Sequence, residues 1–157
     1  MPDASVANGP SRRWLPLLLC SAQSGRADGG YPFDRIRVQK AIFLLTRRGS
    51  ARWNDLYPYR PYDWGPYCRE LVDDLRILAQ VGQMRTSHSA GSRYGRYALT
   101  DQGQQAVDEV WESLPEEERC FLVAVRAYVT SKDFNALLRE VYAAYPEFAT
   151  ESLWNGS

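Results

Sequence analysis

The chain has 157 residues and no net charge, and 45% of its residues are hydrophobic. This length is enough to bury a core without disulfides or metal ions, and an aromatic content of 13% excludes a chain that is disordered throughout. The charge is uneven, because residues 1–99 hold 15 Lys and Arg against 8 Asp and Glu, whereas residues 100–157 hold 4 against 11. A basic part followed by an acidic part suggests two binding roles, with simple solubility of both parts as the alternative.

In the first half of the chain, the pattern predicts two helices and an aromatic connection. Residues 12–23 form an amphipathic first helix, and residues 24–32, with three glycines, form a loop. Asp34 is a good N-cap for a second helix, which Gly49 ends. Residues 50–65 place two prolines among aromatic residues, which predicts an edge strand or a packed loop.

In the second half of the chain, the pattern predicts a helix, a hairpin and further helices. Gly65-Pro66 is expected to open a helix over residues 66–81, because proline fits the first helical position. Residues 83–87 and 93–99 are predicted as the two strands of the hairpin. Thr100 is expected to cap the next helix. The remaining predicted helices cover residues 100–114, 116–129 and 132–145.

Three blocks of sequence carry a family resemblance. In residues 37–45, a Gln-Lys pair precedes apolar residues; residues 59–78 contain Trp64-Gly65-Pro66-Tyr67 followed by a helical pattern; and Tyr97-Ala98-Leu99-Thr100 is followed by Gly103. These blocks resemble winged helix-turn-helix families, and within them the phage-associated, antitoxin-like Panacea-type proteins. The resemblance covers roughly residues 35–105 and implies a winged-helix fold used to bind DNA or protein.

A winged helix would place residues 66–81 in the major groove of DNA and the hairpin against phosphates. The exposed face of that helix carries three carboxylates, Glu70, Asp73 and Asp74, which would repel phosphates. The alternative to DNA binding is that this helix face is exposed to solvent and its charges form ion pairs with one another. The predicted DNA-binding residues therefore lie at the start of the helix and on the hairpin: Tyr67, Arg69, Arg85, His88, Arg93 and Arg96.

Aromatic residues gather between Trp53 and Tyr67. Such side chains stack on unpaired bases in single-strand binders, but a cluster of this kind is more often part of a core. We therefore expect core packing or an oligomer contact here.

The predicted helices over residues 116–129 and 132–145 each have a one-sided apolar stripe. Two helices can cover each other only in part, so one stripe must contact the main domain or another chain. We expect a dimer or partner interface, centred on four residues of the last helix: Phe134, Leu138, Tyr142 and Tyr145.

The sequence offers no arrangement typical of catalysis. The cysteines, Cys20, Cys68 and Cys120, lack metal-ligand spacing, and His88 is the only histidine. A phosphate-cradling glycine motif and a nucleophile elbow are also missing from the sequence. We expect no enzyme activity, no cofactor and no metal. An odd cysteine count and the lack of a membrane-spanning apolar run favour a cytoplasmic protein without membrane contact.

Together these patterns predict a mostly α fold with a small β-hairpin (α+β), namely a winged helix-turn-helix with a C-terminal helical extension. The predicted parts are a flexible tail (1–11), a winged-helix domain (12–114), a helical extension (115–148) and a second tail (149–157). The predicted function is bacterial or phage-linked transcription regulation by a homodimer on double-stranded operator DNA. The alternatives are a non-enzymatic protein-interaction module, antitoxin-like or adaptor, which the acidic segments favour, and a subunit of a larger nucleic-acid machine.

Overall fold

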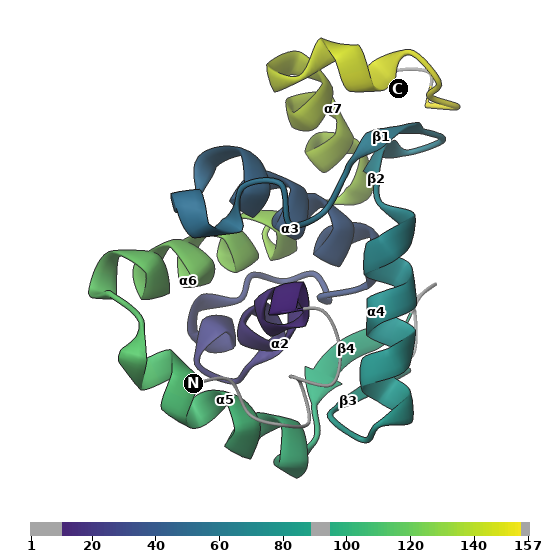
Figure 1. Ribbon diagram of the computed structural model, residues 1–157. Helices are drawn as coiled ribbons and strands as arrows, with labels where there is room; N and C mark the ends of the chain where they lie inside the picture. Colours follow the sequence, from purple (N-terminus) through teal and green to yellow (C-terminus); the bar gives the residue numbers. More distant parts are fainter. Residues whose placement is uncertain (1–10, 89–94, 155–157) are drawn as a thin grey trace.

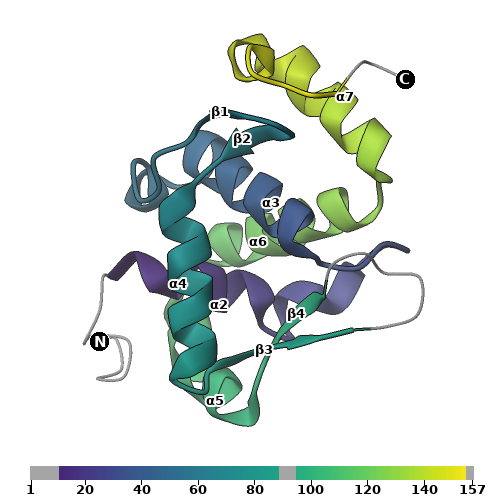
Figure 2. The same ribbon diagram turned by 90° about the vertical axis from the view of Figure 1, so that its right-hand side faces the viewer.

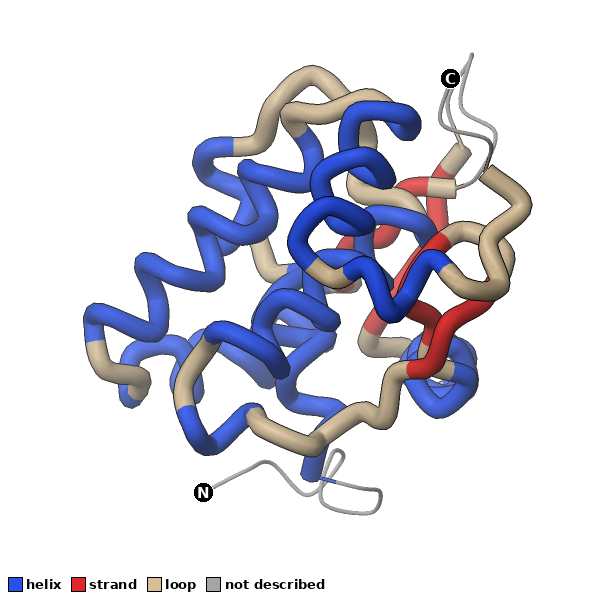
Figure 3. The backbone as a smooth tube through the Cα atoms, turned by 90° about the horizontal axis from the view of Figure 1, so that it is seen from above, coloured by secondary structure: helices blue, strands red, loops and turns tan. Residues whose placement is uncertain are grey.

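The computed structural model describes residues 11–88 and 95–154 and is mostly helical (Figure 1). The α-helices are α2 (Trp14–Cys20), α3 (Arg35–Arg48), α4 (Arg69–Gln80), α5 (Asp101–Ser113), α6 (Glu116–Thr130) and α7 (Phe134–Ala144). The strands are β1 (Arg60–Tyr62), β2 (Gly65–Tyr67), β3 (Met84–Ser87) and β4 (Arg96–Leu99). Short 3-10 segments are η1 (Ser11–Arg13), η2 (Ser24–Ala27), η3 (Ala51–Trp53) and η4 (Pro146–Ala149). The predicted α+β class is confirmed, and the strands gather on one side of the helical body (Figure 3).

The predicted helix caps are present. The Asp34 carboxylate accepts a hydrogen bond from the Arg37 N–H at 3.0 Å, which starts α3. The Thr100 hydroxyl accepts from the Gly103 N–H at 3.1 Å and starts α5. Both bonds satisfy a backbone donor that the first helical turn leaves without a partner, so these helices begin where the local sequence says they should.

The prediction that Gly65-Pro66 opens a helix is wrong. Residues Gly65–Tyr67 form β2, which pairs antiparallel with β1 so that Tyr62 lies opposite Gly65 and Arg60 opposite Tyr67. Gly65 has a φ of 97°, which glycine adopts without steric cost and which closes the tight hairpin turn. The helix itself, α4, begins at Arg69.

The second hairpin, β3–β4, lies between α4 and α5. Met84 pairs with Leu99 and Ser87 with Arg96, so β3 agrees with the predicted strand over residues 83–87. The first residues of the other predicted strand, 93 and 94, lie outside the described part of the chain. A third segment lies beside β4: Asp34 forms an antiparallel bridge with Arg96, and the Phe33 carbonyl accepts from the Tyr97 N–H at 3.1 Å.

Helix α2 is the centre of the core and contacts α3, α5, α6 and β4 (Figure 1). It is buried over its whole length instead of having one exposed face as predicted, and Leu17 and Leu19 are fully buried. Among the described residues, no helix has the length and hydrophobicity needed to cross a membrane.

The C-terminal helices belong to the same core. Leu122 and Val129 of α6 and Leu137 of α7 are fully buried members of the cluster that includes α2 and α3. The boundary predicted at residues 114 and 115 therefore does not divide the core, because α6 covers α3. The predicted tail from residue 149 is also attached, since the Leu153 N–H donates to the Asp63 carbonyl at 2.9 Å.

Because α6 is part of a single core, we expect it to stabilise the entire chain. Leu122→Ala should lower the free energy of unfolding by about 2–5 kcal/mol, because it leaves a cavity beneath α6. Urea unfolding followed by tryptophan fluorescence and by circular dichroism should give one coincident transition. The exposed neighbour Glu112→Ala should change stability by roughly 0.5 kcal/mol or less. Two separate transitions in the Leu122→Ala variant would mean that α6 and α7 form an independent unit.

Candidate nucleic-acid interface

Helix α4 lies between the two hairpins, with β1–β2 at its start and β3–β4 at its end (Figure 1). Its inner stripe, Leu71, Leu75 and Leu78, is buried as the helical spacing predicts. In Figure 2, α4 is on the side of the molecule that faces the viewer, and the β3–β4 hairpin extends beside it. The outer face of α4 and this hairpin therefore lie on the same side of the protein.

The position of α4 is determined by α3. The side-chain amide of buried Gln39 donates to the Cys68 carbonyl at 3.0 Å and accepts from the Cys68 N–H at 3.1 Å. The next residue, Lys40, is also buried, and its Nζ lies 3.5 Å from the Pro66 carbonyl. Burial lowers the pKa of Lys40 to about 7, against the opposing effect of the Asp34 charge. The Gln-Lys pair therefore holds the segment that enters α4.

Asp74 does not face solvent. Its side chain is 1% exposed and accepts hydrogen bonds from Arg12 at 2.7 Å, Arg13 at 3.1 Å and the Tyr57 hydroxyl at 2.9 Å. Burial by itself would raise the pKa of Asp74, but the hydrogen bonds from Arg12, Tyr57 and Arg13 outweigh it and lower that pKa below its usual value. The predicted repulsion between this carboxylate and phosphate is therefore removed by partners far away in the sequence.

Asp73 is the more exposed carboxylate, and it lies between two arginines. Its Oδ1 is 3.2 Å from Arg76 and 3.9 Å from Arg69, one helical turn away on either side. The Arg69 and Arg76 side chains are 72% and 62% exposed. Glu70 is half-buried and lies against the Cys68 thiol at 3.6 Å. The most exposed charges of α4 are thus its arginines.

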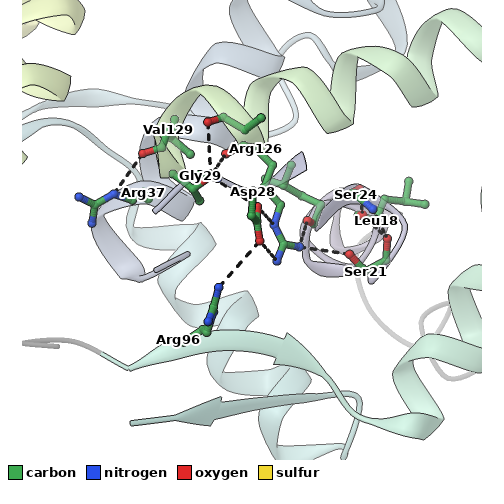
Figure 4. Close-up of polar contacts among 12 residues, drawn as sticks. Leu18, Ser21, Ser24, Asp28, Gly29, Arg37, Arg96, Arg126 and Val129 are labelled. Atoms are coloured by element: carbon green, nitrogen blue, oxygen red, sulfur yellow. Dashed lines mark hydrogen bonds and ion pairs between the residues drawn. The ribbon is translucent and has the colours of Figure 1, made fainter. Parts of the chain in front are cut away.

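The β3–β4 hairpin adds basic and hydroxyl groups to this surface. Arg85, Ser87 and His88 are exposed, as predicted for a phosphate-contacting wing. Arg96 is also exposed and lies 3.9 Å from Asp28, whose closer partner is Arg126 at 3.0 Å (Figure 4). Arg93, the other arginine predicted for this site, lies outside the described residues.

Tyr67 was predicted to lie at the start of the helix, but it lies on β2. It is half-buried and stacks on Tyr62 with ring centroids 4.5 Å apart. On the β1–β2 hairpin, Arg60 and Tyr62 are also exposed, and neither was among the predicted site residues. Their orientation depends on the β1–β2 pairing, which local sequence did not reveal. The core prediction holds for Trp53 and Tyr57, which are buried.

The stripe of α7 predicted to contact another chain is covered by this chain instead. Leu138 is fully buried, and Phe134 packs edge-on against Trp64 with centroids 5.5 Å apart. The other two residues also have aromatic partners within the chain: Tyr145 contacts Phe43 and Tyr142 contacts Trp154. The α7 stripe meets the main domain because the β1–β2 hairpin and η4 lie over it.

Within residues 11–88 and 95–154, no group of three or more His, Cys, Asp or Glu side chains is arranged to hold a metal ion. Burial raises the pKa of the Cys68 thiol to about 11 and that of the Cys20 thiol to about 12, so neither is an activated nucleophile. Comparisons with protein-family models, curated proteins and solved structures gave no match for this chain.

The buried Asp74 cluster should produce a pH-dependent stability. Asp74→Asn should cost about 3 kcal/mol at neutral pH, because Arg12 and Arg13 lose the charge that compensates them. The pKa of Asp74 is lowered by folding, so its stabilising effect is present above the unfolded-state value of about 3.9 and is lost as the pH falls through the folded-state pKa.

Urea titrations at a series of pH values test this expectation. The difference in unfolding free energy between the wild type and Asp74→Asn should shrink as the pH falls below about 4. The matched control Asp73→Asn removes an exposed carboxylate from the same helix and should cost roughly 1 kcal/mol or less. A wild-type advantage that stays constant across the acid range would show that the Asp74 charge is not what stabilises the cluster.

Proposed function

We propose that this chain is a winged-helix DNA-binding protein that regulates transcription by binding double-stranded operator DNA. In this proposal, the exposed face of α4 lies in the major groove and the β3–β4 hairpin contacts phosphates. The observation that carries the proposal is the pairing of the α4 carboxylates. Asp74 is neutralised inside the protein and Asp73 lies between Arg69 and Arg76, so the outer face of α4 is compatible with a phosphate backbone.

The order of the elements supports this proposal. Winged helices have a helix, a short strand, two helices and a hairpin in that order. Here α2 is followed by the bridge at Asp34, then by α3, α4 and the β3–β4 hairpin. The connection between α3 and α4, residues 49–68, is longer than the three- or four-residue turn of a helix-turn-helix and contains the β1–β2 hairpin.

A second candidate function, a protein-interaction module of antitoxin-like or adaptor type, is favoured by a different surface. An apolar groove runs along α6, and none of its lining residues belongs to α4 or to the β3–β4 hairpin. The two functions are compatible, because they use different surfaces.

Phosphate binding by the hairpin predicts a change in salt dependence. The double variant Arg85→Ala and Arg96→Ala should bind a labelled random-sequence DNA duplex more weakly. The slope of log affinity against log salt should become shallower by roughly 0.9 for each phosphate that the variant no longer neutralises. Fluorescence anisotropy at several salt concentrations measures both quantities. Arg139→Ala, on the exposed side of α7, is the matched control and should leave affinity and slope unchanged. Equal slopes for the wild type and the double variant would remove the hairpin from the interface.

Base recognition by the start of α4 predicts a local change in specificity. Arg69 is the first residue of α4, and the N-terminal residues of recognition helices contact base edges. Arg69→Ala should cost about 1–3 kcal/mol at one base pair of the preferred site. Selection from a random duplex library, followed by sequencing, measures preference at each position. Arg76→Ala, two turns further along the same face, should weaken all sequences similarly. An unchanged base preference in Arg69→Ala would show that this end of α4 does not read DNA.

A further inference from the structure

Two adjoining hollows form a groove along the outer side of α6. One part, about 740 Å³, lies between α3, α6 and α7, and another, about 710 Å³, lies at the start of α6 beside η3. The two parts share Arg48, Phe121 and Ala124 in their linings, so they adjoin at these residues. The length of α6 between Glu117 and Tyr128 corresponds to about 16 Å, enough to seat roughly three helical turns.

The floor of the groove is apolar, and small residues leave it open. Leu44 and Phe121 are half-buried there, whereas Ala124 of α6 and Ala144 of α7 are exposed. Arg48 is the basic residue of the lining, and it is held against one wall, where its Nε donates to the Tyr145 hydroxyl at 2.8 Å. Exposed alanines beside large apolar side chains leave room for the apolar face of an amphipathic helix.

The two ends of the groove differ in charge. At the α7 end, Glu140 is paired with Lys132 at 2.9 Å and also accepts from the Tyr128 hydroxyl. At the other end, Glu117 lines the groove and is exposed, and Glu118 also lines it and lies 3.4 Å from Arg52. Glu112 and Glu116, near this end in the sequence, are exposed as well. The N-terminus of α6 contributes only about half a positive charge through its dipole. Arg48 and Arg52 offset part of the charge of the four glutamates, so this end of the groove keeps a smaller surplus of negative charge.

We propose that the groove binds an amphipathic helix of a partner protein, with an apolar face on the floor and a basic end against Glu112, Glu116 and Glu117. The apolar face supplies most of the binding free energy by burying Leu44 and Phe121. The basic end sets the direction in which the helix lies, because only one end of the groove attracts it. This site is separate from the α4 surface, so the proposal does not depend on DNA binding.

Two fluorescein-labelled peptides test the proposal against the full chain. They share a helical leucine and alanine face, and one ends in three lysines where the other ends in three glutamates. We expect the lysine peptide to bind at least tenfold more tightly at low salt by fluorescence anisotropy. The double variant Glu116→Lys and Glu117→Lys should reverse that preference. Ala124→Gln, which fills the groove without adding charge, should weaken both peptides at least fivefold.

Ala79→Gln is the matched control, because Ala79 is an exposed alanine in the last turn of α4, outside the groove. It should leave peptide binding unchanged, and thermal unfolding should show that every variant is folded. Equal affinity for the two peptides, no binding of either, or insensitivity to Ala124→Gln would overturn the proposal. So would a homodimer, seen by sedimentation, that Ala124→Gln dissociates, because the occupant would then be a second copy of this chain.

Discussion

The pair of hydrogen bonds between the Gln39 amide and the backbone of Cys68 is the contact on which the candidate interface depends. Gln39 occupies the N–H and C=O of Cys68 as a neighbouring strand would, in a place that water does not reach. Without Gln39, the buried Cys68 N–H would lose this partner, at a cost of about 1–3 kcal/mol. Residues 65–68 therefore stay extended, α4 begins only at Arg69, and its outer face is turned away from the core. Two of the three sequence blocks that carry the family resemblance, the one with the Gln-Lys pair and the one with the Gly-Pro turn, therefore contact each other.

The parts of the fold that local chemistry decides were predictable from sequence. Asp34 and Thr100 cap helices through bonds to residues three positions away, so the signal and its partner lie in the same short window. Gly65-Pro66 was misread because its local signal fits two structures equally well, a helix start and a hairpin turn. The choice is made by Gln39 and by the pairing of β1 with β2, and neither lies within the window that suggested a helix.

Sequence patterns predict charged positions and apolar stripes, but they do not show which other segments cover them. Asp74 looked like an exposed acid on a recognition helix, yet Arg12, 62 residues earlier in the chain, neutralises it. Leu138 looked like part of a partner interface, yet it is fully buried beneath the chain's own segments. For Leu138, helical spacing gave the correct face, and the tertiary arrangement decides what covers it. For Asp74 the predicted face is wrong, because this residue lies on the buried stripe with Leu71 and Leu78. The candidate surfaces that remain are those with large exposed fractions in the folded chain: the α4 arginines, the β3–β4 hairpin and the groove along α6.

Asp28 connects the hairpin to the helix that forms the groove. Its carboxylate lies 3.0 Å from Arg126 of α6 and 3.9 Å from Arg96 of β4, and the Arg126 guanidinium also donates to the Leu19 and Ser21 carbonyls. The two contacts are unequal, since buried Arg126 is fixed by several acceptors whereas exposed Arg96 makes only the longer ion pair among the described residues. Exposed ion pairs contribute little to stability, so Arg96 can leave Asp28 for a phosphate while Arg126 keeps the carboxylate compensated. In the proposed DNA complex, the core would then stay intact and the groove along α6 would keep its shape.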